Sequence, residues 1–472
     1  MSKQLRIIAR LDVKSDNVIK GVNFEGLRVI GSPWELALKY VEQGADELLY
    51  LDTVASLYGR SNLFDVIKRT AENIDIPIIA GGGVRSLEDI DNLLKAGADK
   101  VAINTYAVNN PNFIELAVKK YGSQCIVASI NAKKIEDGKW VVWTDNAREP
   151  TKKDVFEWAL ELQSLNVGEI LITSIDNDGT LKGLNSDITQ KIAPFLKVPF
   201  IFGGGYSPLE DLEFLLNHDV DGIVLGSALH YDKVKIKEIK DELLGIGIDT
   251  RNELPIILSK FDKSSNKNVS IIDYGVGNTF GLIQSLKKIG VKANIIRSAL
   301  EISNADRIIL PGVGAFSFAM NKLKELQLIE SLNSFVKSGK PILGICLGAQ
   351  LLLDESYEDG INEGLSFIPG IVSLIDYTDK CKVPHVGWSA IYKTKTHGEN
   401  CEIASKINDG GKAYFVHSYE MKVPDEYVMM TTNYHGNEIN AFIKKNNIYG
   451  LQFHPEKSGN FGLNILKFFS EV

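Results

Sequence analysis

The stretch ELLYLD at residues 47–52 returns as EILITS at residues 169–174, and this repeat decides the fold of the N-terminal half. The offset is 169 − 47 = 122 residues, and it is shared by the glycine runs that begin at Gly81 and Gly203 and by the segments that begin at Asp99 and Asp221. Three landmarks in one register indicate two similar halves. Apolar runs alternate with amphipathic stretches, four runs to each half, as in βα units around a parallel sheet. The sequence therefore predicts an α/β fold with a (β/α)8 TIM barrel over residues 1–255.

The barrel pattern stops before KFDKSSNKN at residues 260–268, a polar segment with few apolar residues. Such a composition is typical of a linker, and a new apolar run, VSIIDYG, starts at residue 269. A chain of 472 residues is also too long for one ordinary core. We therefore predict a linker at residues 256–267 and a second α/β domain over residues 268–472.

Composition limits the classes of partner. The hydrophobic content of 44% and the charged content of 24% are those of a soluble globular protein. The net charge of −8 comes without any basic block, so we expect no nucleic-acid partner. Asp12 and Lys14 interrupt the apolar core that a signal peptide would need, and no run approaches 18 apolar residues. We expect a cytoplasmic protein with no membrane partner that acts on small molecules.

The segment PILGICLGAQ, residues 341–350, predicts a cysteine nucleophile. Glycines on both sides of Cys346 permit a sharp turn from a strand into a helix, and a helix N-terminus lowers the pKa of a thiol. Downstream, GLQFHPEKS places His454 and Glu456 two positions apart at a strand end, so that both face one way. We expect His454 to deprotonate the thiol of Cys346 while Glu456 orients the imidazole.

Backbone amides near this cysteine could stabilise an oxyanion. The turn PGVGAF at residues 311–316, together with the amide of Leu347, predicts an oxyanion hole. The other cysteines, Cys125, Cys381 and Cys401, lack the C-x-x-C spacing of a zinc site and are expected to be structural. We expect neither a metal nor a cofactor.

In a TIM barrel the functional residues sit at the carboxyl ends of the strands. The glycine triplets and the donor pairs that follow them occur in both halves, so we predict two phosphate sites facing each other across the barrel mouth. The predicted phosphate-binding residues are Lys20, Gly82, Gly83, Asn104, Thr105, Thr173, Asp178, Gly179, Gly204, Gly205, Gly226 and Ser227.

One carboxylate lies between the predicted phosphate sites. Asp12 ends an apolar run and could exchange a proton with a ligand. Its counterpart in the repeat is Asn131, whose amide cannot act as an acid or a base. Alternation along the strand aims Arg10 at the same interior as Asp12.

Four charged residues mark the opposite end of the barrel. Each opens an apolar run, so they lie at similar height, and we predict a closed ring of ion pairs that stabilises this face or gates the interior. They are Arg6, Glu47, Lys100 and Glu169.

Residues 268–472 resemble the triad-type glutamine amidotransferases, because GICLG, HPE and PGVG are all present. The resemblance implies hydrolysis of glutamine. It also implies that glutamine is bound by Gly314, Leu347, Gln350, Ser418 and Tyr419.

Nearly the whole chain resembles the imidazole glycerol phosphate synthase family of histidine biosynthesis, in which a glutaminase pairs with a cyclase barrel. The shared phrases include LDVK, GGGVRS, GADKVAIN, TSIDNDGT, DYGVGN, HVGW and FVHSY. The resemblance implies that ammonia passes the ring and reaches a bis-phosphorylated ribulosyl-aminoimidazole carboxamide ribotide. It would yield imidazole glycerol phosphate and aminoimidazole carboxamide ribotide, with Asp12 as the essential carboxylate and both domains paired within one chain.

The chain departs from that family at two positions. Asn131 replaces the second acid, and Arg10 stands where a small or thiol residue is usual. These departures favour two alternatives: a paralogue that supplies ammonia to a partner amidotransferase in the modification of surface-polysaccharide sugars, or a non-catalytic barrel that only activates the glutaminase. The twin phosphate loops and Asp12 favour the synthase.

Overall fold

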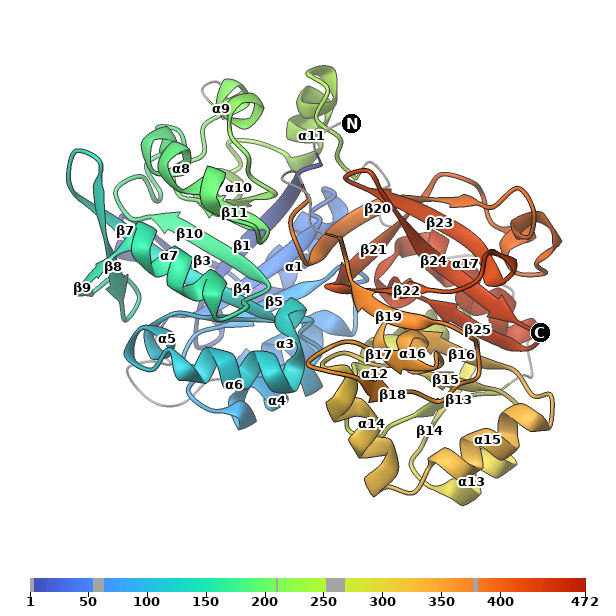
Figure 1. Ribbon diagram of the computed structural model, residues 1–472. Coiled ribbons are helices and arrows are strands. Elements are labelled where there is room, and N and C mark those ends of the chain that lie inside the picture. Colours follow the sequence, from blue (N-terminus) through green and yellow to red (C-terminus); the bar gives the residue numbers. More distant parts are fainter. Residues whose placement is uncertain (1–3, 54–62, 209–210, 252–267, 377–380) are drawn as a thin grey trace. The chain divides into compact units, whose positions relative to one another are not determined.

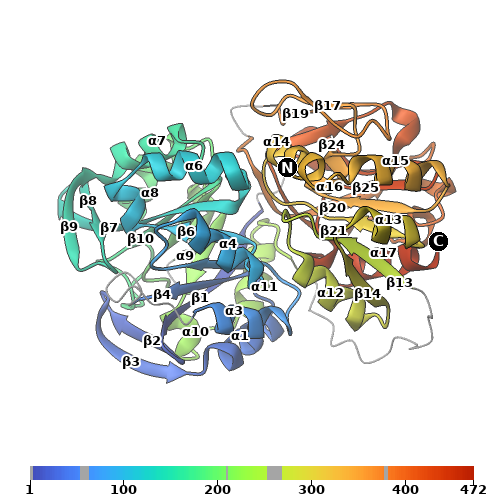
Figure 2. The same ribbon diagram turned by 90° about the horizontal axis from the view of Figure 1, so that it is seen from below.

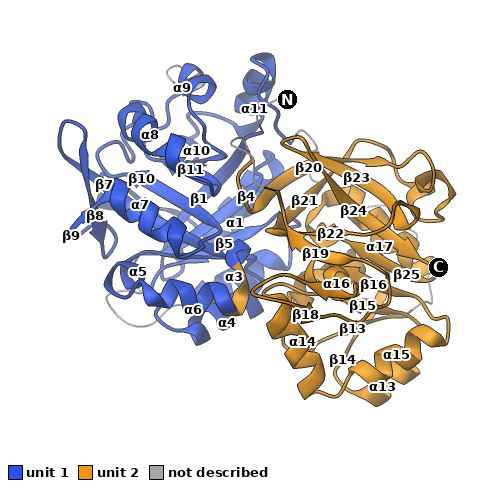
Figure 3. Cartoon of the chain, viewed as in Figure 1, with its two compact units in different colours: residues 1–119, 123–255 blue, residues 120–122, 256–472 orange. Residues whose placement is uncertain are grey.

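The computed structural model describes residues 4–53, 63–208, 211–251, 268–376 and 381–472. Its contacts divide the chain into two compact units, residues 1–119 with 123–255 and residues 120–122 with 256–472 (Figure 3). The linker that we predict at residues 256–267 lies outside the described residues. We describe each unit by itself.

Unit 1 is a closed parallel barrel. Within the described residues, eight strands pair side by side, and the β7–β10 and β1–β12 pairings close the circle. The barrel strands are β1 (Arg6–Lys14), β4 (Glu47–Asp52), β5 (Ile78–Gly81), β6 (Lys100–Ile103), β7 (Ile126–Glu136), β10 (Glu169–Ser174), β11 (Phe200–Gly203) and β12 (Gly222–Leu225). The predicted barrel is therefore confirmed.

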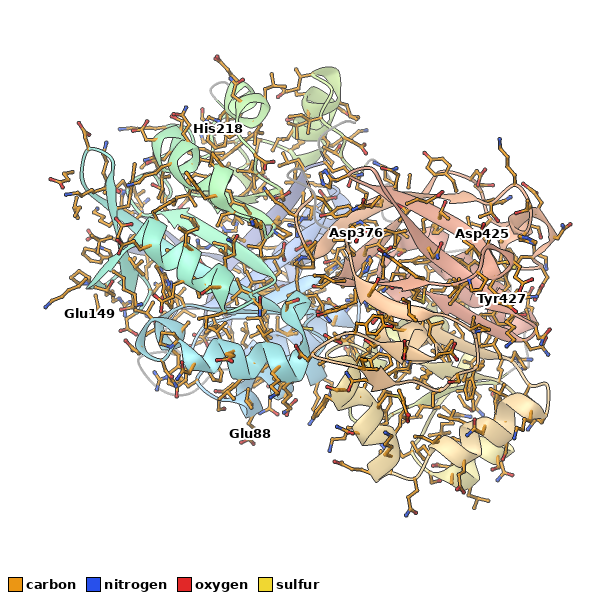
Figure 4. All side chains as sticks on the ribbon, viewed as in Figure 1. Glu88, Glu149, His218, Asp376, Asp425 and Tyr427 are labelled. Carbon is orange, nitrogen blue, oxygen red and sulfur yellow. The ribbon has the colours of Figure 1, made fainter. Side chains whose placement is uncertain are left out.

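Helices lie on the outside of the barrel (Figures 1 and 2). They are α1 (Pro33–Glu42), α3 (Leu63–Ala71), α4 (Leu87–Lys95), α5 (Thr105–Asn109), α6 (Asn112–Tyr121), α7 (Val155–Ser164), α8 (Ser186–Ile192), α9 (Asp211–Asn217), α10 (Ser227–His230) and α11 (Ile236–Gly245). Glu88 on α4 is exposed on the outer surface of the unit (Figure 4).

One buried apolar layer crosses the barrel interior. Each barrel strand contributes one side chain to it, namely Ile8, Leu49, Ile79, Ala102, Val127, Leu171, Ile201 and Val224. The strands therefore share a packed core rather than an open pore, as is general for this fold.

Two antiparallel extensions follow equivalent strands of the repeat. Strands β2 (Asn17–Val22) and β3 (Glu25–Gly31) continue from β1, and strands β8 (Lys139–Thr144) and β9 (Glu149–Asp154) continue from β7. Both extensions start at the carboxyl end of a barrel strand, so they rise beside the barrel mouth.

Unit 2 is built on a mixed sheet in the order β14-β13-β15-β16-β25-β24-β23-β20-β21, with a smaller sheet in the order β18-β17-β19-β22. The larger sheet contains β13 (Asn268–Ile272), β14 (Lys292–Ile296), β15 (Ile308–Leu310), β16 (Ile342–Ile345), β20 (His385–Lys393), β21 (Gly411–His417), β23 (Val428–Tyr434), β24 (Asn437–Lys445) and β25 (Ile448–Leu451). The smaller sheet contains β17 (Glu355–Ser356), β18 (Asn362–Glu363), β19 (Ile371–Leu374) and β22 (Tyr419–Lys422).

Helices cover both faces of the larger sheet. Consecutive strand residues, such as Ile271 and Ile272, point to opposite faces and belong to two different apolar clusters. One cluster contains α12 (Thr279–Lys288) and α17 (Gly459–Glu471), and the other contains α13 (Ala299–Asn304), α14 (Phe316–Glu325) and α15 (Ile329–Lys337). Unit 2 is thus the predicted α/β domain. No helix among the described residues of either unit is long and apolar enough to cross a membrane.

Candidate active sites

Cys346 sits on a strained turn between β16 and the short helix α16 (Leu347–Gln350). Its backbone angles are φ 52° and ψ −114°, a region that side chains rarely occupy and that marks functional sites. The flanking glycines are required for close packing. A Cβ at Gly348 would lie 1.9 Å from the Leu310 carbonyl oxygen, and one at Gly344 would lie 2.6 Å from the Ala349 Cα. The geometry is that of a nucleophile elbow.

His454 and Glu456 face each other as expected, with 2.8 Å between His454 Nδ1 and Glu456 Oε1. They do not lie on the end of the strand itself, because β25 stops at Leu451 and Pro455–Lys457 forms a short 3-10 helix. The other ring nitrogen, Nε2, makes no hydrogen bond of ordinary geometry within the described residues.

The charge state of His454 suits a thiolate partner. Burial alone would lower the pKa of His454, but Glu456 and Cys346 outweigh it and hold that pKa well above its ordinary value. The imidazole is therefore protonated at neutral pH in the presence of an ionised thiol, which is the arrangement that activates a cysteine.

Replacing Glu456 with glutamine keeps the size of the side chain but removes the charge that supports protonated His454. A raised histidine pKa contributes stability that is complete below the unfolded value of about 6.5 and is lost as pH rises through the folded pKa. Glu456→Gln should therefore cost more stability at pH 6 than at pH 10, measured by urea unfolding at both. Glutamine turnover should fall on the order of 10²- to 10⁴-fold. An equal loss of stability at both pH values would contradict this assignment.

The PGVG turn packs directly against the elbow. A Cβ at Gly312 would lie 2.8 Å from the Gly348 amide nitrogen, and the Tyr274 hydroxyl fixes the turn by donating to the Pro311 carbonyl at 2.8 Å. Gly314 has φ 131°, which a side chain would strain. The turn is thus held close enough to Cys346 to supply the predicted oxyanion hole together with the amide of Leu347.

Some of the predicted glutamine contacts lie on segments close to the same cysteine. Gln350 follows it on α16, and β21 passes nearby, with the Val416 carbonyl oxygen 4.0 Å from Cys346 Sγ. Ser418 is buried at the end of β21, and Tyr419 opens β22. Two neighbours were missed, Tyr274 and Gln452, although both stand inside quoted motifs (DYGVGN and QFHPE). Only tertiary contacts reveal their partners.

At the barrel mouth of unit 1, two cavities occupy equivalent positions in the repeat. The larger, of ≈ 430 Å³, is lined in part by Gly82, Gly83, Asn104 and Thr105. The smaller, of ≈ 20 Å³, is lined in part by Asp178, Gly179, Gly204, Gly205, Gly226 and Ser227.

The two cavities share one backbone design. Asn104 precedes α5 with φ −121° and ψ −88°, and Gly226 precedes α10 with φ −121° and ψ −85°. Each cavity also holds a buried polar atom without a hydrogen-bond partner within the described residues, Asn104 Nδ2 in the larger and Ser227 Oγ in the smaller. Buried donors normally find partners, so a water or a ligand atom is expected beside each of these two atoms.

Arg10 lines both cavities and lies among buried charges. Arg10 Nε donates to Asp12 Oδ1 at 2.8 Å, and Lys20 Nζ contacts Asp178 Oδ2 at 2.7 Å and Asp12 Oδ2 at 3.5 Å. Burial alone would raise the pKa of Asp12, but Arg10 and Lys20 hold it below its ordinary value. Asp12 is therefore ionised at neutral pH, suited to accept a proton rather than to donate one.

Two of the predicted phosphate-binding residues take other places at the mouth. Thr173 and Lys20 are not among the residues that line either cavity; Thr173 Oγ1 accepts from Arg10 Nη1 at 3.3 Å, and Lys20 pairs with the two aspartates. Asn131 lines the larger cavity, which Arg10 also lines.

The four charged residues at the opposite end form a closed, buried ring. Arg6 reaches Glu47 at 2.8 Å and Glu169 at 2.5 Å, and Lys100 reaches the same two carboxylates at 2.7 Å and 2.5 Å. Burial alone would raise the pKa of Glu47, but Lys100 and Arg6 lower it. Each charge thus has two opposite neighbours.

Known protein families match both units of the chain. Residues 6–235 match the family described as histidine biosynthesis protein, and residues 270–471 match glutamine amidotransferase class-I. The chain is 53% identical to the imidazole glycerol phosphate synthase subunit HisF of Legionella pneumophila over 207 residues, which are 44% of this chain and 98% of that relative. The chain belongs to the HisF family. The HisF subunit of Campylobacter concisus is 45% identical over 246 residues, 52% of this chain and 97% of that relative. The HisF-type barrel is fused here to a class-I glutamine amidotransferase domain.

Proposed function

We propose that the chain is a glutamine-dependent imidazole glycerol phosphate synthase. In unit 2, the Cys346 thiolate attacks the side-chain amide carbon of glutamine, and protonated His454 gives its proton to the departing ammonia. Water, losing a proton to the now neutral His454, then hydrolyses the thioester to glutamate and releases the Cys346 thiolate beside protonated His454. The released ammonia would convert phosphoribulosyl-formimino-aminoimidazole carboxamide ribotide into imidazole glycerol phosphate and aminoimidazole carboxamide ribotide in unit 1.

The observation that carries this proposal is the pair of matched cavities at the barrel mouth. Each combines glycines of positive φ with a helix N-terminus and an unpartnered buried donor, a combination that suits a phosphate. Arg10 lines both cavities and is ion-paired with Asp12. A ligand with a phosphate at each end would span both cavities and would lie near Asp12.

The barrel interior suits neutral ammonia as the transferred species. The proposed route enters through the ring of Arg6, Glu47, Lys100 and Glu169. Beyond the ring lies the apolar layer, which would oppose a charged ammonium ion far more than ammonia. The ring would therefore gate the passage rather than only stabilise this end.

The proposal is tested by giving the purified protein the ribulosyl substrate with ammonium salts alone and following both products. We expect turnover that rises with pH as ammonia replaces ammonium. A folded protein that binds the substrate but forms neither product would overturn the proposal.

One observation favours a second function, the supply of ammonia to a partner amidotransferase acting on another acceptor, such as a surface-polysaccharide sugar. Arg10 is ion-paired with Asp12, and the cavity that Arg10 also lines offers the amide of Asn131 rather than a carboxylate. The amide of Asn131 cannot serve as a second acid to complete a proton transfer.

The variant Arg10→Ala with Asn131→Asp separates these functions. It frees Asp12 from its ion pair with Arg10 and supplies a second carboxylate. If native Arg10 and Asn131 prevent the cyclase reaction, the variant should gain ammonia-dependent cyclase activity by at least about tenfold. The synthase would be favoured if the wild-type protein already converts the ribulosyl substrate and the variant does so no faster. The conservative variant Arg10→Lys keeps the charge and serves as the control.

A further inference from the structure

The geometry points to Gln452 as a positioning residue that holds an N–H donor against the Cys346 sulfur. Gln452 is fully buried, and its Nε2 lies 3.9 Å from Cys346 Sγ. This inference rests on the proposed glutaminase role of Cys346, and it adds a residue that neither the triad nor the oxyanion turn includes.

The orientation of the Gln452 amide follows from a fixed reference, the backbone carbonyl of Tyr419. A carbonyl oxygen only accepts, so the group of Gln350 that lies 2.8 Å from it must be the amide nitrogen Nε2. The same nitrogen lies 3.1 Å from Gln452, and it must therefore face the Gln452 oxygen Oε1. Gln452 is left with its Nε2 toward the sulfur.

The carbonyl that sets this orientation is itself held by two buried histidines. His417 Nδ1 lies 2.8 Å from the Tyr419 oxygen and must donate to it. Burial lowers the pKa of His417 to about 4, so the ring is neutral and its Nε2 accepts from His385 Nδ1 at 3.1 Å. His385 Nε2 in turn accepts from the Ser389 hydroxyl at 2.8 Å. The donor and the acceptor of each hydrogen bond from Ser389 to Gln452 are therefore fixed.

A donor at the sulfur favours the thiolate over the thiol, because hydrogen bonding to a charged form stabilises that form. The Val416 carbonyl oxygen also lies near the sulfur, at 4.0 Å, and it can only repel a thiolate. The titratable side chains whose charges act on Cys346 or on its base are His454, Glu456, Tyr274 and His417. Gln452 adds a neutral donor to that set.

The test measures the pH dependence of Cys346 alkylation by iodoacetamide in the full chain, for the wild type, Gln452→Leu and Gln452→Met. Both variants remove the donor and put an apolar side chain of similar size in its place. Their folding is checked by circular dichroism. We expect the apparent pKa of alkylation to rise by about one unit in both. Glutamine kcat should fall about tenfold with KM nearly unchanged.

The control is Gln163→Leu, which removes a glutamine of unit 1 that also bridges two groups, Phe195 and Lys197. It should leave the alkylation profile unchanged. A wild-type alkylation profile in folded Gln452→Leu and Gln452→Met would overturn the role of Gln452. A wild type that does not hydrolyse glutamine, combined with a shifted profile in both variants, would instead reject the proposed function and leave the role of Gln452 intact.

Discussion

Replacing Cys346 with alanine should reduce glutamine hydrolysis on the order of 10⁴-fold or more, because the attacking atom is removed. The backbone at residue 346 has φ 52°, and alanine has the same main-chain freedom as cysteine there, so the elbow should keep its shape. Glutamate release, measured in a coupled assay, reports the loss. Product formation from ammonium salts should continue, because that route does not use the thiol.

The matched control for Cys346 is Cys381→Ala. Cys381 is another buried cysteine of unit 2, and burial raises its pKa to about 11, so it is expected to be unreactive. Its replacement should leave hydrolysis within about twofold of wild type. Loss of both the glutamine-dependent and the ammonium-dependent reaction in a folded Cys346→Ala variant would mean that the two sites cannot be separated as proposed.

Replacing Asp12 with asparagine should reduce ammonium-dependent product formation on the order of 10³-fold. The amide cannot accept a proton, whereas the carboxylate is held ionised by Arg10 and Lys20. Lys20 keeps its contact with Asp178, so the charged cluster loses one partner rather than collapsing. Glutamine hydrolysis in the absence of acceptor should stay near the wild-type rate.

The control for Asp12 is Asp16→Asn, four positions along the chain and exposed in the turn between β1 and β2. It removes the same charge from the same end of the strand without touching the buried cluster. If Asp12→Asn and Asp16→Asn had equal, small effects, Asp12 would be structural and the cyclase proposal would lose its base.

The barrel could be predicted because its information is local and repeated. Apolar runs such as residues 47–52 set each strand, and the common offset places two halves in one register. The ring of four charges follows from the same logic, since residues that open strands share one height. Arg10 and Asp12 are two apart on β1, so alternation alone places them on one face, where they form an ion pair at 2.8 Å.

The rest of the site depends on contacts between distant segments. In the sequence, nothing distinguishes Gln452 from other polar residues near His454. Its contact with Gln350 joins residues 102 positions apart. Tyr274 likewise reaches Pro311 across 37 positions. The sequence also could not show that Thr173 would bond to Arg10 rather than line a cavity. Such choices are made by packing, which no local pattern records.

The most direct measurement uses glutamine labelled with ¹⁵N in its side-chain amide, together with the ribulosyl substrate and the full chain. The proposed function predicts that ¹⁵N appears in imidazole glycerol phosphate and that the label is lost in Cys346→Ala supplied with unlabelled ammonium salts. Labelled ammonia that accumulates in solution while no imidazole glycerol phosphate forms, with or without ammonium salts, would contradict it and leave ammonia supply to another acceptor as the function.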